Sequence, residues 1–146
     1  VLSDSLEGEA RDLAAQQAEM AVQIAIENLP HPVLLLSGGE CTVTRTGDGV
    51  GGPNAEFTLA AAIALKGHPR IHVMACDTDG VDGAAEVAGA IADPTTLALA
   101  EAMEVSPRGA LERNNAHGFF AKINGQIITG PTLTNVNDFR AFLVMP

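Results

Sequence analysis

Short apolar runs rich in β-branched residues alternate along this chain with alanine-rich stretches whose apolar residues recur at helical spacing. The runs 33–36 and 71–75 are continuous and apolar, which is typical of strands covered on both faces. The stretches 13–26 and 57–65 place their apolar residues along one helical face. This alternation predicts an α/β layer structure. We expect a single domain, a mixed and mostly parallel sheet, and helices packed on its faces.

Turn and cap signals predict the remaining elements. Residues 1–32 form a leading helical segment that ends at Asn28 and Pro30, and residues 33–146 form the α/β domain. Asn54 is the expected N-cap of a helix that stops at Gly67. Further helices are expected at 94–103 and 107–113, and further strands at 42–46, 127–128 and 139–144.

Charge and hydropathy exclude some classes of protein. The net charge is −10, and nucleic-acid backbones are bound mainly through Lys and Arg, so we expect no nucleic-acid partner. No apolar run approaches the roughly 20 residues of a membrane span, and the acidic start lacks the basic flank of a signal peptide. The spacing of Cys41 and Cys76 is compatible with a disulfide, but we expect reduced thiols in a cytoplasmic protein.

Four polar, glycine-rich segments follow or bridge the strand-like runs, at 37–41, 47–54, 76–83 and 129–138. Ligands of open α/β sheets bind at the carboxyl ends of strands, so these segments are the candidate site. The segment 47–56 combines glycines with a helix start, which suits a phosphate or a carboxylate, and a flexible connection is the alternative. It is not a Walker A loop, and it matches the dinucleotide fingerprint only loosely.

The carboxylates of Asp77, Asp79 and Asp82 have the oxygen chemistry that a hard cation such as Mg²⁺ prefers. Asp and Gly also favour turns for structural reasons alone, which is the alternative reading. His117 lies among polar residues, but a solvated or core histidine is the better expectation than a catalyst. Ser37 lacks the surrounding pattern of a nucleophile elbow, so no catalytic residue is identified.

Several motifs occur together in a specific order along nearly the whole chain. They are Ser37-Gly38-Gly39-Glu40, Gly51-Gly52-Pro53-Asn54-Ala55-Glu56-Phe57, Asp77-Thr78-Asp79-Gly80-Val81-Asp82-Gly83, Ala88-Gly89-Ala90, Asn114-Asn115, and Thr129-Gly130-Pro131-Thr132-Leu133-Thr134-Asn135-Val136-Asn137-Asp138. This series resembles the MOFRL domain. That domain is the C-terminal part of class II glycerate 2-kinases, many of which carry the older label of hydroxypyruvate reductase from tartrate utilisation.

The resemblance implies a two-domain enzyme in which the N-terminal, Rossmann-like domain of the same polypeptide is the partner and the active site lies in the cleft between the domains. There ATP with Mg²⁺ would phosphorylate the 2-hydroxyl of D-glycerate. NAD(P)H-dependent reduction of hydroxypyruvate, or a catalytically weakened ligand-binding domain, is the alternative. A homodimer is compatible with the sequence.

The resemblance also implies which residues line the cleft. Asp79 and Asp82 would order the metal ion. Substrate or phosphate would be bound by Ser37, Gly38, Gly39, Glu40, Gly51, Gly52, Asn54, Glu56, Thr129, Gly130, Thr132, Thr134, Asn135, Asn137 and Asp138.

One departure from the family pattern concerns position 53. Members usually carry Gly-Gly-Arg-Asn, whereas this chain has Pro53, which offers neither a guanidinium nor a backbone N–H. Loss of a charged contact of that kind costs on the order of 10²–10³ in rate. The resemblance therefore implies a slow, altered or inactive enzyme, in which Pro53→Arg raises kinase activity.

Overall fold

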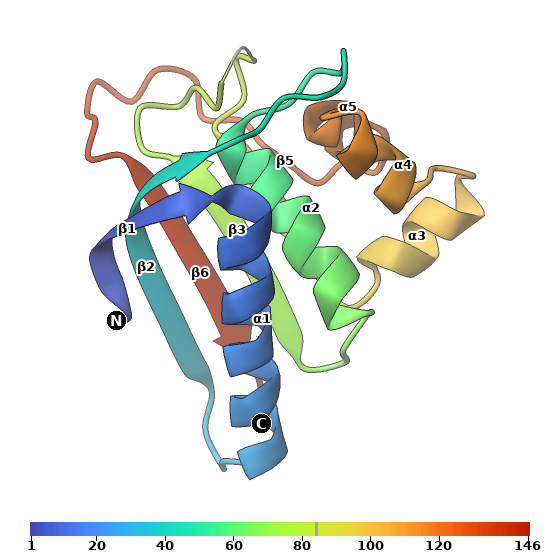
Figure 1. The fold of residues 1–146 in the computed structure, drawn as a ribbon. Coiled ribbons are helices and arrows are strands. Elements are labelled where there is room, and N and C mark those ends of the chain that lie inside the picture. Colours follow the sequence, from blue (N-terminus) through green and yellow to red (C-terminus); the bar gives the residue numbers. More distant parts are fainter. Residues whose placement is uncertain (84) are drawn as a thin grey trace.

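The computed structural model describes residues 1–83 and 85–146, which form a six-stranded sheet and its helices (Figure 1). The elements in chain order are β1 (Ser3–Glu9), α1 (Ala10–Glu27), β2 (Val33–Thr42), α2 (Pro53–Leu65), β3 (Ile71–Asp77), β4 (Gly89–Ala92), α3 (Thr96–Ala102), α4 (Pro107–Glu112), α5 (Ala116–Lys122), β5 (Gln126–Ile127) and β6 (Asp138–Val144). The expected single α/β domain is confirmed.

The direction of the strands differs from the prediction. The strand order is β1-β2-β6-β3-β4-β5, and β6 pairs antiparallel with both β2 and β3. β4 is antiparallel to β3 and β5, so within the described residues only β1 and β2 run parallel. The prediction of a mostly parallel sheet is therefore wrong. β6 reaches the sheet through a loop instead of a crossover helix, so it runs opposite to the strands on either side.

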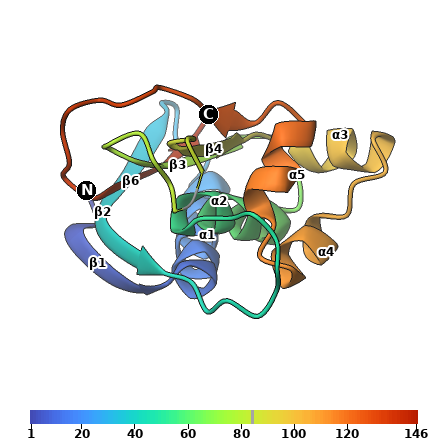
Figure 2. The same cartoon turned by 90° about the horizontal axis from the view of Figure 1, so that it is seen from above.

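The two long helices cover one face of the sheet, where they lie side by side (Figures 1 and 2). α1 buries a stripe of alanines spaced three and four residues apart, Ala10, Ala14, Ala18, Ala21 and Ala25. These small side chains let α1 approach α2 and the sheet closely. α2 is buried on most sides because α1, α3, α4, α5 and the strands all contact it.

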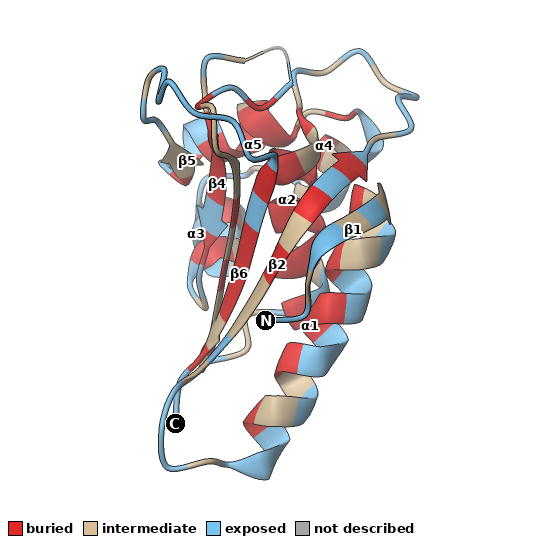
Figure 3. Cartoon of the chain, turned by 90° about the vertical axis from the view of Figure 1, so that its left-hand side faces the viewer, coloured by how far each residue is buried: buried red, intermediate tan, exposed pale blue. Residues whose placement is uncertain are grey.

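The opposite face of the sheet carries no helix of the described chain (Figure 3). Leu34, Ile91 and Phe139 lie on this face, and each is more than a third exposed. The prediction of helices on the faces of the sheet thus holds for one face only. The alternation of burial along β2 and β6 follows from this one-sided cover, because successive side chains of a strand point to opposite faces.

Three elements have no counterpart in the sequence prediction: β1, β4 and α5. Residues 3–9 were expected to lead into a helix, but they form a strand beside β2, and the helix begins at Ala10. β1 is acidic and largely exposed, so no apolar alternation marks it as a strand. The expected strand 42–46 is also absent, because β2 continues from Val33 to Thr42 and the chain then leaves the sheet.

Candidate functional site

The predicted loops meet at one edge of the sheet. β2 ends at Thr42 and β3 ends at Asp77, while the antiparallel β6 begins there, with Asp138 paired to Gly39 and to Asp77. Residues 43–52, 78–83, 85–88 and 129–137 all leave from this edge, which lies uppermost in Figure 1. The glycine-rich segments that the sequence singled out are therefore gathered along one rim.

Residues 37–40 lie within β2 and do not form a separate loop. Gly39 has φ +112°, and a Cβ there would lie 2.3 Å from the backbone oxygen of Leu6, so only glycine fits this position. The register of β1 against β2 shifts between Ser3 and Leu6, opposite this glycine. The Ser37-Gly38-Gly39-Glu40 motif thus shapes the strand beside β1, and Glu40 is its exposed member.

Asp82 caps the N-terminus of α2 from a distant loop. Its Oδ1 accepts the backbone N–H of Asn54 at 2.9 Å, and its Oδ2 accepts that of Ala55 at 2.8 Å. The helix has no cap from its own N-cap residue, which is Gly52 and not the predicted Asn54. A Cβ on Gly52 would lie 2.4 Å from the backbone oxygen of Asp82, so this close approach requires glycine.

His117 supports the same carboxylate from α5. Its Nε2 lies 3.0 Å from Oδ2 and 3.1 Å from the backbone oxygen of Asp82. Both neighbours are acceptors, so Nε2 carries the hydrogen. His117 is a buried histidine with a structural partner, in line with the expectation of a core residue. Because Asp82 occupies the start of α2, a ligand phosphate or dinucleotide cannot use those helix amides in the usual way.

Asn54 joins this cap to a second buried carboxylate. Its Nδ2 donates to Asp82 Oδ1 at 3.2 Å and to Asp138 Oδ1 at 2.7 Å. Asp138 Oδ2 accepts Arg140 Nη1 and the backbone N–H of Cys41. Arg140 is fully buried and also donates to the backbone oxygen of Gly38. We call Asn54, Asp82, His117, Asp138 and Arg140 the buried polar cluster.

Glu56 is a second carboxylate with internal partners. Its Oε1 lies 2.6 Å from Arg11 Nε of α1, and its Oε2 accepts Asn114 Nδ2 at 3.1 Å. Asn114 Oδ1 in turn accepts the backbone N–H groups of Thr46 and Gly47. Glu56 therefore fixes the loop after β2 through Asn114, and its charge is matched within the protein.

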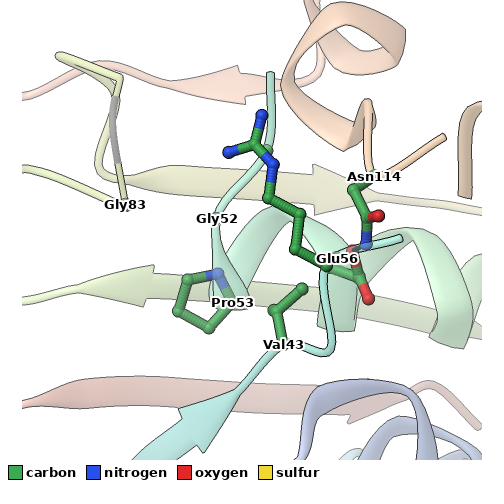
Figure 4. A pocket seen from close by; sticks show the side chains of 8 residues that line it. Val43, Gly52, Pro53, Glu56, Gly83 and Asn114 are labelled. Atoms are coloured by element: carbon green, nitrogen blue, oxygen red, sulfur yellow. Dashed lines mark hydrogen bonds between the residues drawn. The ribbon is translucent and has the colours of Figure 1, made fainter. Parts of the chain in front are cut away.

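A hollow of about 190 Å³ lies above this junction; we call it the α2 hollow. It is lined by Val43, Arg45, Gly51, Gly52, Pro53, Glu56, Gly83 and Asn114. In Figure 4 the side chains of Val43 and Pro53 bound it on one side, and Glu56 and Asn114 lie close together at its back. The predicted residues Gly51 and Gly52 thus line an open space, whereas Asn54 is buried below it.

The predicted metal ligands Asp79 and Asp82 have different surroundings. Asp79 is partly exposed, and its carboxylate accepts the backbone N–H of Val81 and Nδ2 of Asn135. Burial is the main cause that raises the pKa of the neighbouring Asp77. No group of three or more His, Cys, Asp or Glu side chains suited to a metal ion occurs among residues 1–83 and 85–146.

Residues 129–137, the rim loop, carry the most accessible predicted side chains. Thr129, Thr132, Thr134, Asn135 and Asn137 are all exposed. Thr132 Oγ1 donates to the backbone oxygen of Thr78, and Val136 N–H donates to Thr78 Oγ1. The rim loop is therefore tied to the loop after β3, while most of its polar groups face outward.

Both cysteines are free thiols, as expected. Cys41 lies beside the buried polar cluster, and burial raises its pKa to about 11. The pKa of Cys76 is also raised, again chiefly by burial.

A membrane span needs a long and apolar helix, and none of the helices among the described residues meets both conditions.

Sequence reasoning missed several residues that build this edge, namely Arg11, Gln17, Arg45 and Arg140. Arg140 stands alone in the apolar segment Phe139 to Val144, and its inward position is the signal that could have revealed a buried partner. Arg11 and Gln17 have no such signal, because their partners Glu56 and Ser37 lie far away in sequence.

Comparison with known proteins gives one consistent family. The MOFRL family model matches residues 33–138. A protein of Agrobacterium vitis named "Putative hydroxypyruvate reductase" is 45% identical over 148 residues, covering 99% of this chain and 38% of that protein. The D-glycerate 2-kinase of Thermotoga maritima is 36% identical over 147 residues, covering 99% of this chain and 35% of that protein.

A crystal structure of glycerate kinase from Thermotoga maritima has the same fold. It superposes with a TM-score of 0.93 at 37% identity, covering 97% of this chain and 35% of that one. The chain therefore spans about a third of the length of the curated relatives it matches.

Proposed function

This chain belongs to the MOFRL family, and from that premise we propose that it supplies one wall of the active site of a glycerate 2-kinase. The second wall would come from the rest of a longer polypeptide, since the relatives are about three times as long as the matched region. The proposed reaction transfers the γ-phosphoryl group of ATP to the 2-hydroxyl of D-glycerate.

The observation that carries this proposal is the gathering of the predicted loops along one rim. Residues 43–52, 78–83, 85–88 and 129–137 leave the sheet at the same edge, above the layer of helices and strands (Figure 2). Phosphoryl transfer depends mainly on positioned charges and hydrogen-bond donors, with little covalent chemistry for the protein to do. A rim of loops on a fixed scaffold supports that role.

In the reaction, the bond between the γ-phosphorus and the bridging oxygen of ATP breaks and ADP leaves with that oxygen. A bond from the γ-phosphorus to the 2-oxygen of glycerate forms, and the proton of the 2-hydroxyl passes to water. The exposed hydroxyl and amide groups of Thr132, Thr134 and Asn135 suit the hydroxyls and carboxylate of a small hydroxy acid. The buried polar cluster holds the base of the rim in place and does not itself reach the substrate. We assign it a positioning role.

For the expected Mg²⁺, the two predicted ligands fit unequally. Asp82 does not fit, because its side chain is fully buried and both of its oxygens accept hydrogen bonds at the start of α2. Asp79 fits better, because its carboxylate is partly exposed on the rim, where it accepts the backbone N–H of Val81 and Nδ2 of Asn135. Mg²⁺ in such enzymes is usually held by one or two carboxylates together with substrate phosphates, and there it neutralises phosphate charge. Asp79 is therefore the residue of this chain that we propose for it.

Reduction of hydroxypyruvate is the second candidate, because one relative carries that name. The structure speaks against a dinucleotide on this chain, since the carboxylate of Asp82 stands where a pyrophosphate would meet the helix start. We place the enzyme in the cytoplasm, where reducing conditions keep thiols such as Cys41 and Cys76 free.

The test compares two reactions of the complete protein that contains this chain. One mixture holds D-glycerate, ATP and Mg²⁺ and is followed by ³¹P NMR for phosphoglycerate. The other holds hydroxypyruvate and NADH and is followed at the NADH absorbance. We expect 2-phosphoglycerate from the first mixture and no oxidation in the second. NADH oxidation without phosphoglycerate formation would overturn the kinase proposal.

A further inference from the structure

Arg45 and Glu56 are the charged side chains that line the α2 hollow, and they differ in their partners. Glu56 is fully buried and is matched by Arg11 and Asn114. Arg45 is exposed and forms no ion pair with a carboxylate of the described chain. The guanidinium of Arg45 is therefore the charge that the hollow offers to an incoming group.

Hydrogen bonds to the backbone of its own loop hold the side chain of Arg45 in place. Its Nε donates to the backbone oxygen of Gly47 at 3.3 Å, and its Nη2 donates to that of Gly49 at 3.0 Å. Nη1 has no hydrogen-bond partner among the residues described and is left to bind a ligand. A guanidinium fixed in this way loses less conformational entropy on binding an oxyanion than a free side chain would.

The backbone amides at the hollow fall into two sets. The first residues of α2 offer no N–H group to a ligand, because Asn54 and Ala55 donate to Asp82 and Pro53 has no N–H. The N–H groups of Gly51 and Gly52 donate to no atom of the described chain, and both residues line the hollow. The hollow is thus lined by Arg45 and by two glycines whose backbone N–H groups have no partner in the described chain. The carboxylate of Asp82, the nearest negative group below Gly52, already has His117 beside it.

We propose that Arg45, with the amides of Gly51 and Gly52, forms a binding site for a substrate oxyanion and thereby takes the place of the arginine expected at position 53. Arg45 and Pro53 line the same hollow, so a guanidinium from either position reaches the same space. The ligand is a phosphate of the nucleotide or the carboxylate of the hydroxy acid. Its identity rests on the proposed function, whereas the oxyanion site rests on the hollow itself.

The kinetic test uses Arg45→Ala in the complete protein, with Arg108→Ala as the matched control. Arg108 is an exposed arginine that lines a different hollow, beside Ile63 and Lys66 near the other end of α2. We expect kcat/KM to fall about 100-fold for Arg45→Ala and to change less than about twofold for the control. A rise in the KM for ATP assigns the site to phosphate, and a rise in that for glycerate assigns it to carboxylate. Unchanged kinetics for Arg45→Ala overturns the proposal.

Position 53 provides a rescue experiment. The resemblance alone predicts that Pro53→Arg raises kinase activity, but the present proposal predicts otherwise. Pro53→Arg alone should change kcat/KM by less than about threefold, because the hollow already holds a guanidinium, whereas Pro53→Arg in the Arg45→Ala background should restore at least about tenfold. A large gain from Pro53→Arg in the otherwise unchanged protein, with no rescue in the double variant, would show that Arg45 does not replace the missing arginine.

A binding measurement separates this inference from the kinase proposal. Inorganic phosphate is titrated by calorimetry into the protein and into its Arg45→Ala and Arg108→Ala variants, without nucleotide or glycerate. We expect Arg45→Ala to weaken binding at least about tenfold and Arg108→Ala to leave it unchanged. Arg45-dependent binding in a protein without kinase activity would sink the proposed function alone. Kinase activity and phosphate binding that are both indifferent to Arg45 would sink the oxyanion site alone.

Discussion

The buried polar cluster makes its hydrogen bonds within the protein, whereas the rim loop at the same edge of the sheet leaves most of its polar side chains exposed. Asp82 and Asp138 accept hydrogen bonds from α2, α5, β2 and β6. Thr134 and Asn135 lie in a loop whose hydrogen bonds run within the loop and to the turn after β3. Residues of the predicted motifs are thus either engaged inside the protein or open to solvent, and burial separates the two groups.

The largest effect should come from Arg140→Met, which removes the fully buried partner of Asp138. The carboxylate would remain buried without its ion pair, so the free energy of unfolding should fall by about 3–5 kcal/mol. Urea denaturation measures this change, and Arg108→Met serves as the exposed control, expected within about 0.5 kcal/mol. Equal effects of the two substitutions would remove the distinction between the cluster and the surface.

Asp82→Ala tests whether that carboxylate acts as a helix cap. The change leaves two backbone N–H groups of α2 without their acceptor. It also removes the carboxylate beside His117, whose Nε2 keeps only the backbone oxygen of residue 82. We expect the free energy of unfolding to fall by about 2–3 kcal/mol. Asp79→Ala is the matched control, because Asp79 is a partly exposed carboxylate of the same loop. Asp79→Ala should barely change the free energy of unfolding, while kinase activity should fall if the Asp79 carboxylate contacts the metal ion.

The buried thiol of Cys41 should make the free energy of unfolding depend on pH. Burial raises its pKa from the ordinary 9.0 to about 11, so the folded thiol keeps its proton where the unfolded thiol loses it. Between about pH 9 and pH 11 the unfolded state binds fewer protons, so the free energy of unfolding should fall as pH rises, by about 2 kcal/mol. Denaturation at several pH values measures the slope. Cys41→Ala should flatten it more than Cys76→Ala does, and equal slopes in both variants would contradict the assignment.

The smallest effect on stability should come from Thr134→Ala in the rim loop. The side chain is exposed, so the free energy of unfolding should stay within about 0.5 kcal/mol. If the hydroxyl binds substrate, kcat/KM should fall about tenfold, as for one lost hydrogen bond. Thr134→Ser keeps the hydroxyl and should keep the activity. A loss of stability without a loss of activity would place Thr134 with the buried polar cluster.

Local patterns predicted the elements that carry a clear period or cap. The sequence predicted that the first helix ends at Asn28 and Pro30, and α1 does end at Glu27 with Asn28 as its C-cap, while β3 covers the apolar run 71–75. β1 and β4 were not predicted, because one is acidic and exposed and the other spans only Gly89–Ala92. Both are strands because of the neighbours they pair with, which no local pattern records.

The sequence also singled out the segments of the candidate site, which the fold gathers at one edge of the sheet. Of their residues, Gly51 and Gly52 line an open hollow. Sequence reasoning also assigned ligand contacts to Asn54, Glu56 and Asp138, whose side chains are buried and make hydrogen bonds inside the protein through the Asn54 amide nitrogen and the two carboxylates. No local pattern in the sequence marks Arg45 as a candidate site residue. Only the folded loop places Arg45 at the same hollow as Pro53.

By itself the sequence determined the α/β class, the family motifs and the positions of the glycine-rich turns, because periodicity, caps and motif order are properties of neighbouring residues. Only the tertiary structure decided that β6 lies antiparallel between β2 and β3 and that Asp82 caps α2. Strand direction and the burial of a carboxylate depend on partners far away in the chain, and the free energy of such pairings exists only once the chain has folded.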